Sequence, residues 1–342
     1  MPLGGHAGPA IWTVADGRAG ILNQVKALRA ALEEPERAAR LAHIRSGAHR
    51  AAPLILQPHG FQVNLKPNLW PAPFAALPED QRELLTPPWP DLWIAAGRRS
   101  IPYSSRMRRI TRGKTMVVQT QDPKVPLGPF DLVIPPEHDG LAGKKVFPIL
   151  GAPTWFAADK VSEAQNRFAS LKAEAGQKIL VSLGGDSRTH TFSEDTAGAI
   201  ETVLEGLAPG RRLWITVSRR TPQHARMRFR ATAQRIGAVF WENEQRDGPN
   251  PYLAFLSMCD VALVTEDSAN MISDPAFFAK PIYMLKLAGH SKRFDRMHKG
   301  FIDRGVARWF GSRLETWNYP PLREAARAAD EIVRLMLERH PR

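Results

Sequence analysis

The chain has 342 residues, of which 43% are hydrophobic and 24% are charged, a composition that excludes an intrinsically disordered protein. Its length exceeds the roughly 250 to 300 residues that one hydrophobic core usually supports, so we expect two domains. The net charge of +13 favours an anionic partner such as a nucleotide phosphate or an acidic lipid. The basic residues are dispersed and no groove-reading motif is found, so we expect no nucleic-acid partner.

The single cysteine, Cys259, excludes an intrachain disulfide and a cysteine-rich zinc site. It lies in an apolar run, where a buried core residue is a simpler interpretation than a nucleophile. The first twenty residues lack the pattern of a secretory signal, and no run of about 18 apolar residues could span a bilayer. We therefore expect a cytoplasmic protein, with peripheral attachment to the inner face of the membrane as the alternative.

The first half opens with a strand and a helix. Residues 11–14 are apolar and enter a glycine-containing turn at 16–20, and a helical spacing of apolar residues follows over 23–34. Residues 41–90 are rich in Pro and Trp and predict loops, with short helices near 73–85. The alternation then resumes, with a helix over 100–111 and strands at 91–97, 115–120 and 132–134.

The second half repeats this alternation after a polar connection over 151–176. Helices are predicted over 196–207, 222–236 and 322–339, and a further helix begins after residue 266. Apolar runs predict buried strands at 178–183, 212–217, 238–241 and 261–265, and after Pro281. We predict an α/β protein of two doubly wound Rossmann-like domains that face each other across a cleft.

Polar loops follow three strands of the second half, at the strand ends where open α/β sheets bind ligands. A glycine turn with nearby guanidinium groups suits a diphosphate, and Asp274 is a candidate to accept ribose hydroxyls. The full set of candidates for binding an anionic nucleotide is Gly184, Gly185, Asp186, Ser187, Arg188, Ser218, Arg219, Arg220, Glu266, Asp267, Ser268, Asn270, Met271 and Asp274. Taken singly, ordinary turns, solvated surface and helix capping explain each loop equally well.

Negative charge at Glu266 and Asp267 lies beside this proposed anion site, so both side chains must turn towards ribose, base or an arginine. Neither has a further His or carboxylate at ligand spacing, so we expect no metal and no cofactor. No Gly-x-Ser-x-Gly elbow, P-loop or Gly-x-Gly-x-x-Gly motif occurs, which disfavours hydrolase, ATPase and simple dinucleotide-binding functions.

The first half supplies candidates for a general base that would activate an acceptor hydroxyl. Asp16 is the first choice, because the first loop of such a domain points into the cleft, although Asp16 before Gly17 is also ordinary turn chemistry. His138 and Asp139 are second, and Asp122 also lies at a strand end. Candidates for binding the acceptor are Gly17, Arg18, Gly20, Gln24, Arg98 and Arg99.

An ordered set of motifs over nearly the whole chain resembles the "elongated mitochondria" family of mitochondrial fission. The motifs are residues 16–20 with Asn23 and Gln24, 90–100, 121–123, 136–139, 218–222, 250–252 and 265–268. For plant members, the resemblance implies recruitment of a dynamin-related protein to mitochondria. A protein partner is therefore one expectation for this chain.

The second half is also similar to GT-B glycosyltransferases such as the lipid-linked peptidoglycan transferase. That resemblance implies an acceptor domain over 1–150, a nucleotide-sugar domain over 151–320, and a C-terminal helix over 321–342 that packs back towards the N-terminal domain. The chain departs from those enzymes at residues 267–269, which replace a glycine loop, and at Asp274, which replaces a Glu.

Two functions are therefore expected. The first is metal-independent transfer of a sugar from a nucleotide-sugar donor to a lipid-linked or envelope glycan acceptor. The alternative is a non-catalytic recruitment or scaffold protein that binds a protein partner or an anionic membrane.

Overall fold

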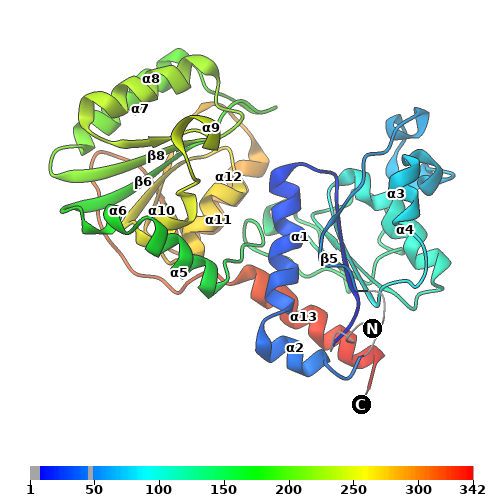
Figure 1. The fold of residues 1–342 in the computed structure, drawn as a ribbon. Helices are drawn as coiled ribbons and strands as arrows, with labels where there is room; N and C mark the ends of the chain where they lie inside the picture. The colour runs from blue at the N-terminus through cyan, green and yellow to red at the C-terminus, as the bar shows by residue number, and fades with distance from the viewer. Residues whose placement is uncertain (1–7, 45–48, 342) are drawn as a thin grey trace. The chain divides into compact units, whose positions relative to one another are not determined.

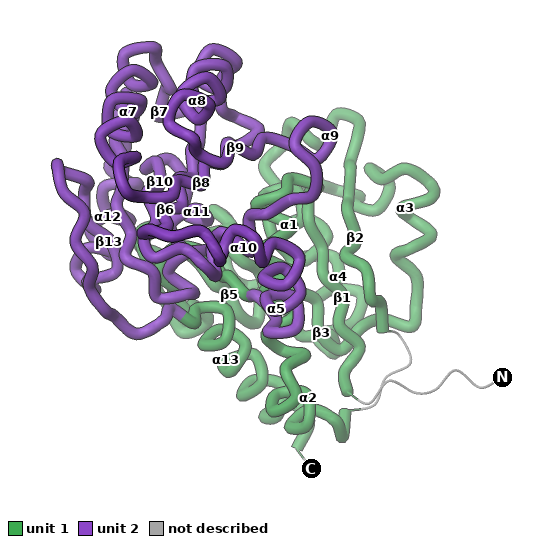
Figure 2. The backbone as a smooth tube through the Cα atoms, turned by 60° about the vertical axis from the view of Figure 1, so that its left-hand side comes forward, with its two compact units in different colours: residues 1–155, 323–342 green, residues 156–322 purple. Residues whose placement is uncertain are grey.

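The computed structural model describes residues 8–44 and 49–341, which form two compact units. Unit 1 comprises residues 1–155 and 323–342, and unit 2 comprises residues 156–322 (Figure 2). Each unit contains its own parallel sheet, so the predicted α/β class with two Rossmann-like domains is confirmed. Among the described residues, no helix is long and apolar enough to span a bilayer.

Unit 1 is built on a five-stranded parallel sheet in the order β2-β1-β3-β4-β5. This is the flavodoxin-like order, in which the strand order reverses between β1 and β3. The strands are β1 (Ile11–Ala15), β2 (Leu54–Ile55), β3 (Leu92–Ala96), β4 (Met116–Thr120) and β5 (Leu132–Ile134). Every residue of β1, β3, β4 and β5 is buried, which explains why these strands are continuous apolar runs in the sequence.

Helices cover both faces of the unit 1 sheet, and alternate β1 side chains enter two separate cores. Ile11 packs in the core formed with α1 and α13, whereas Trp12 packs in the core on the α4 side. The helices are α1 (Ala19–Leu32), α2 (Pro35–Leu41), α3 (Glu79–Glu83), α4 (Ile101–Ile110) and α13 (Glu324–Arg339), with 3₁₀ turns η1 (Phe61–Asn64), η2 (Pro67–Leu69), η3 (Pro73–Ala76), η4 (Arg98–Ser100) and η5 (Glu137–Asp139).

The C-terminal helix α13 packs on α1 and α2 of unit 1 (Figure 1). Its apolar face, including Ile332 and Val333, is buried in the same core as α1. The Glu324 carboxylate accepts a hydrogen bond from the backbone N–H of Leu150 at 3.0 Å. The last helix of the chain thus belongs to the unit formed by the first 155 residues.

Unit 2 is built on a six-stranded parallel sheet in the order β13-β11-β10-β6-β8-β9. This is the dinucleotide-binding Rossmann order, with its reversal between β6 and β10. The strands are β6 (Gln177–Leu183), β8 (Arg211–Val217), β9 (Val239–Trp241), β10 (Val261–Thr265), β11 (Ile282–Leu285) and β13 (Ala307–Trp309). Two further short strands, β7 (His190–Thr191) and β12 (Ala288–Gly289), pair antiparallel with each other.

In unit 2, α7 and α8 lie on one face of the sheet, and α5, α6, α10 and α11 lie on the other (Figure 1). Alternate residues of β6 follow this division, since Ile179 and Val181 pack in the core with α7 and α8. The helices are α5 (Ala158–Arg167), α6 (Ala169–Ala173), α7 (Glu194–Leu207), α8 (Gln223–Ile236), α9 (Glu244–Asp247), α10 (Tyr252–Met258), α11 (Ala269–Phe277) and α12 (Lys292–Asp303).

Candidate functional site

The three predicted loops of unit 2 follow the neighbouring strands β10, β6 and β8. These strands are parallel, so their carboxyl ends meet at one edge of the sheet, at the reversal between β6 and β10. Hydrogen bonds join the loops directly. The Gly184 N–H donates to Thr265 Oγ1 at 2.7 Å, and the Asp186 N–H donates to the Arg220 carbonyl at 3.1 Å.

An ion pair between Asp267 and Arg220 lies at the centre of these loops. Arg220 Nη2 donates to Asp267 Oδ2 at 2.5 Å, and the Asp267 side chain is 0% exposed while that of Arg220 is 42% exposed. The same carboxylate accepts from Thr265 Oγ1 at 2.7 Å and from the Gly185 N–H at 3.2 Å. The Asp267 carboxylate therefore faces an arginine, and both of its oxygens accept hydrogen bonds from groups of the protein.

The glycines at the end of β6 make room for this arrangement. A Cβ on Gly184 would overlap the Asp267 carboxylate, and a Cβ on Gly185 would overlap the Arg220 backbone. The backbone amides of Gly184, Gly185 and Asp186 already donate to protein acceptors. The Asp267 carboxylate therefore lies directly against Gly184, and the backbone amides of the glycine turn have acceptors within the protein.

Two cations at this edge remain available. Arg188 and Arg219 are both exposed, and neither forms an ion pair within the described residues. Arg226, which the sequence did not single out, fixes the loop that carries Arg219: it donates to the Thr221 carbonyl at 2.6 Å and to the Arg219 carbonyl at 2.7 Å. Arg188 and Arg219 are therefore the candidate cations of this edge that no carboxylate of the described residues neutralises.

Polar side chains of the β6 and β8 loops stabilise the loops themselves. Asp186 Oδ1 accepts from the Phe192 N–H at 2.8 Å, and Ser187 Oγ accepts from the His190 N–H at 3.1 Å. Ser218 Oγ accepts from the Arg220 N–H at 3.1 Å. These side chains set the shape of the site.

Residues after β10 also have partners inside unit 2. Ser268 caps α11 by accepting from the Met271 N–H at 3.4 Å, while Asn270 and Met271 are half-buried in its first turn. Asp274, the candidate ribose acceptor, accepts from the Tyr252 hydroxyl at 3.0 Å. Burial, with Asp274 adding to it, raises the pKa of that tyrosine well above its ordinary value, so the hydroxyl keeps its proton.

Glu266 brings in a histidine that the sequence reasoning missed. Glu266 Oε1 accepts from the Leu287 N–H at 2.8 Å, and His298 Nε2 lies 2.9 Å from the Glu266 carbonyl. His298 Nδ1 lies 3.8 Å from Glu266 Oε2, and the histidine side chain is 2% exposed. Burial lowers the pKa of His298, so its neutral form is favoured beside the site. No sequence signal marked it, because it is one polar residue in an amphipathic helix.

In unit 1, Asp16 lies at the end of β1, at the reversal of strand order. Its side chain is 3% exposed and pairs with Arg18, whose Nη2 lies 2.6 Å from Asp16 Oδ2. A Cβ on Gly97 would come within 2.7 Å of the same oxygen. This hydrogen bonding to Asp16 raises the pKa of Arg18. Asp16 is thus a buried carboxylate paired with one exposed cation.

The other acceptor candidates separate into exposed and structural residues. Arg98 and Arg99 are exposed on η4, directly after β3. Gln24 is 8% exposed, and its side-chain carbonyl accepts from Thr120 Oγ1 at 3.3 Å, so it joins α1 to β4. Gly17, with φ of 83°, forms the turn, and Gly20 lies within α1.

The second-choice bases lie elsewhere on this edge. The side chains of His138 and Asp139 are each 5% exposed, with 3.9 Å between His138 Nε2 and Asp139 Oδ1. They follow β5, which is three strand spacings, roughly 14 Å, from β1. Asp122 pairs with Lys124 at 2.6 Å. The structure does not join Asp16 and the His138–Asp139 pair into one catalytic group.

Comparison with known proteins decides the family. The sequence model described as "Mitochondrial fission ELM1" matches residues 19–336. The chain belongs to this family. "Mitochondrial fission protein ELM1" of Arabidopsis thaliana is 29% identical over 281 residues, which cover 73% of this chain and 65% of that protein. "Uncharacterized protein RP120" of Rickettsia prowazekii (strain Madrid E) is 26% identical over 374 residues, covering 96% and 98%.

Two solved structures of similar fold are UDP-GlcNAc 2-epimerases. The UDP-GlcNAc 2-epimerase of Neisseria meningitidis bound to UDP-GlcNAc has a TM-score of 0.55 at 11% identity, over 96% of this chain and 100% of that chain. The Methanocaldococcus jannaschii UDP-GlcNAc 2-epimerase in complex with UDP-GlcNAc and UDP has a TM-score of 0.51 at 10% identity, over 96% and 99%. This ELM1-family chain therefore has the GT-B-like fold, as the sequence predicted.

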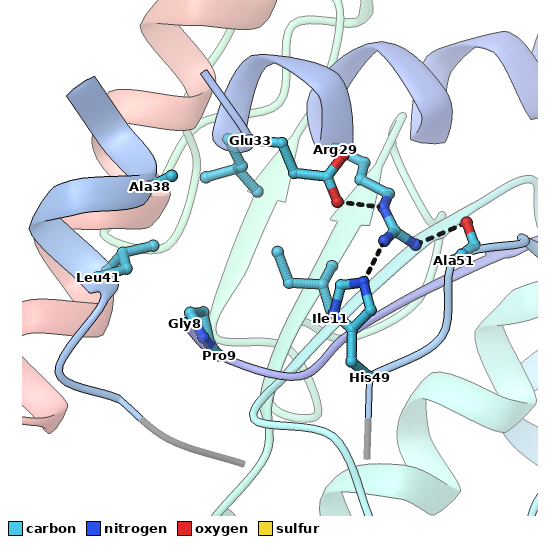
Figure 3. A pocket seen from close by; sticks show the side chains of 10 residues that line it. Gly8, Pro9, Ile11, Arg29, Glu33, Ala38, Leu41, His49 and Ala51 are labelled. Atoms are coloured by element: carbon cyan, nitrogen blue, oxygen red, sulfur yellow. Dashed lines mark hydrogen bonds and ion pairs between the residues drawn. The ribbon is translucent and has the colours of Figure 1, made fainter. Parts of the chain in front are cut away.

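A cavity of about 480 Å³ in unit 1 of this ELM1-family chain lies away from the strand ends described above. Its wall includes Ile11, at the amino end of β1, and Arg29, in the last turn of α1 (Figure 3). Arg29 donates to Glu33 Oε1 at 2.7 Å and to the Ala51 carbonyl at 2.9 Å. Since Asp16 follows the carboxyl end of β1, this cavity is not the predicted acceptor site.

Within 8–44 and 49–341, no three His, Cys, Asp or Glu side chains are grouped closely enough to hold a metal ion. The buried Cys259 thiol has a pKa raised to about 12 by burial, as suits a core residue.

Proposed function

We propose that this ELM1-family chain is a GT-B-like glycosyltransferase. Unit 2 would bind the nucleotide-sugar at the edge formed by β10, β6 and β8, and unit 1 would bind a lipid-linked or envelope glycan acceptor. The observation that supports the proposal is the convergence of three polar loops, with exposed Arg188 and Arg219, at the strand-order reversal of a Rossmann sheet. The reaction would take place in the cytoplasm, at the inner face of the membrane.

The proposed chemistry needs a base and neutralisation of a leaving group. Asp16 would accept the proton of the acceptor hydroxyl. The hydroxyl oxygen would attack the anomeric carbon of the donor sugar, and the bond from that carbon to the diphosphate would break. Arg18 is 65% exposed, so it can swing away from Asp16 when an acceptor arrives. Arg188 and Arg219 would neutralise the departing diphosphate, and arginines rather than a metal ion would supply this charge. Arg220 would act indirectly, by holding the loops through Asp267.

Calorimetry with UDP-, GDP-, ADP- and CMP-linked sugars tests the donor site. UDP-GlcNAc heads the panel because the solved Neisseria epimerase binds it. Arg219→Ala should weaken binding by about tenfold or more, since a charge-assisted contact is lost. Arg212→Ala is the control, because Arg212 is an exposed arginine at the amino end of β8, opposite the loop that carries Arg219, and it pairs with Glu174 at 3.3 Å. Absence of binding to all four donors would contradict the proposal.

The alternative is a non-catalytic recruitment protein, and one observation favours it. The Asp267 carboxylate lies where a Cβ on Gly184 would be and accepts a hydrogen bond from the Gly185 N–H, which leaves little room for a phosphate between Gly184 and Asp267. This function predicts that Arg219→Ala and Asp274→Ala still complement a deletion strain. Loss of complementation by folded variants, together with lost donor binding, would exclude it in favour of the enzyme.

A further inference from the structure

Unit 1 exposes large apolar side chains in one stretch of sequence. Two of the exposed large hydrophobic residues in the described chain lie on neighbouring 3₁₀ turns. Phe61, on η1, is 71% exposed, and Leu69, on η2, is 58% exposed. The nearby Ile55, at the end of β2, is 40% exposed. Exposed apolar residues that gather in one place mark an interaction surface more often than residues scattered singly.

These side chains are held outward by a fixed loop. Gln62 and Ala72 exchange two hydrogen bonds, from Gln62 Nε2 to the Ala72 carbonyl at 3.4 Å and from the Ala72 N–H to Gln62 Oε1 at 3.3 Å. On the inner side, Trp70 meets Tyr103 of α4 edge-on, with ring centroids 6.1 Å apart. The loop therefore buries Trp70 against α4, whereas Phe61 and Leu69 stay exposed to solvent.

Positive charge accompanies these apolar residues. Lys66, between η1 and η2, is exposed, as are Arg98 and Arg99 on η4. Arg98 Nη2 lies 3.5 Å from the Leu65 carbonyl, which places η4 beside this loop. Residues 57–78 include no acidic side chain, and within the described residues none of these three cations forms an ion pair.

We propose that Phe61, Lys66, Leu69, Arg98 and Arg99 form a docking face for an anionic lipid bilayer. Stable peripheral attachment needs two signals, and this face supplies both: apolar side chains that enter the acyl boundary and cations that pair with lipid phosphates. A protein partner would be met better by a groove or a flat apolar patch than by two exposed apolar side chains in a loop accompanied by unpaired cations.

This docking face adjoins the candidate base of unit 1. A Cβ on Gly17 would lie 3.2 Å from Ile55, and a Cβ on Gly97, the residue before Arg98, would lie 2.7 Å from Asp16 Oδ2. Docking would therefore bring the β1 and β3 loops to the lipid surface. Only this consequence, the presentation of Asp16 to a lipid-linked acceptor, rests on the proposed function; docking itself does not require sugar transfer.

Vesicle flotation of the full chain tests docking. We expect binding to phosphatidylcholine vesicles that contain about 30% phosphatidylglycerol, much weaker binding to phosphatidylcholine alone, and weakening by about 0.5 M salt. Phe61→Ser and Leu69→Ser should each lower the partition coefficient about tenfold. Lys66→Glu should lower it too. Met227→Ser is the apolar control, at 65% exposure on α8, and Lys144→Glu is the charge control.

A polarity-sensitive dye separates insertion from mere adhesion. The native Cys259 is fully buried, so a dye would label Leu69→Cys selectively. Its emission should shift to the blue on anionic vesicles, whereas a dye on Met227→Cys should not respond. No flotation of the folded wild type, or equal loss with the Met227 and Lys144 controls, would overturn the docking face. Sugar transfer with a soluble acceptor would survive either result, so the two proposals can fail separately.

Discussion

The glycine at the end of β6 and the carboxylate opposite it should be energetically coupled. Gly184→Ala places a methyl group where the Asp267 carboxylate lies, and Asp267→Ala removes that carboxylate. Both changes therefore break the same hydrogen bonds, although the residues are 83 positions apart in sequence. A double-mutant cycle measures this shared loss.

The magnitude of each change follows from the bonds of Asp267. Removing the carboxylate leaves the Gly185 N–H and the Thr265 hydroxyl as buried donors without acceptors, at about 1 to 3 kcal/mol each. Arg220 adds little, because its side chain is 42% exposed and can turn to water. Asp267→Ala should thus cost about 2 to 6 kcal/mol. Gly184→Ala should cost about as much, since it must expel the carboxylate.

The double variant should cost no more than the worse single variant, which makes the coupling energy about 2 kcal/mol or larger. Urea unfolding should be followed by hydrogen exchange of β6 peptides, because a chain of two units need not unfold in one step. Gly198→Ala in α7 is the control; nothing closer than 4.0 Å would meet its Cβ, so it should be neutral or slightly stabilising. Costs that add to within about 0.5 kcal/mol would refute the reasoning.

Three further outcomes are expected. Gly97→Ala, at φ of 87° and with its Cβ 2.7 Å from Asp16, should destabilise unit 1 by about 1 to 3 kcal/mol in thermal melts, more than Gly140→Ala, whose Cβ meets nothing. Burial lowers the pKa of His298, so the wild type should lose stability as pH falls below 6.5; His298→Gln should flatten that part of a melting-temperature profile, and an unchanged profile would count against it. Hydrogen bonds from Thr232, Arg228 and Arg235 lower the pKa of Glu201 to about 2. The stabilisation from ionised Glu201 should therefore be complete above pH 4.5 and be lost as the pH falls towards 2. Acid unfolding of Glu201→Gln should not show this loss.

Buried parallel strands were the most predictable part of this fold. β1, β3, β4, β6, β8 and β10 were expected to within about two residues, because strands covered on both faces are continuous apolar runs. The sequence did not indicate β2 or β13, which have two and three residues, or the β7–β12 pair. Such short strands exist because of hydrogen bonds to distant partners, and a local pattern carries no record of those bonds.

In the candidate site, the sequence predicted where the polar loops lie but not which residues pair within them. Polar loops after buried strands identified the edge formed by β10, β6 and β8, since residues there need not enter the core. The sequence also left open whether Asp267 turns to a ligand or to an arginine. It turns to Arg220, 47 residues away, and Gly184 and Gly185 leave the space that this buried carboxylate and the Arg220 backbone need.

The sequence by itself determined the α/β class, the two-domain organisation, the family and the strand ends that carry polar residues, because each depends on local periodicity or on ordered motifs. Only the tertiary structure decided the strand orders, the partners of Asp16, Asp267 and Asp274, and the place of His298 beside Glu266. The physical reason is that the partner of a buried charge is chosen by contacts between distant segments once the chain has folded.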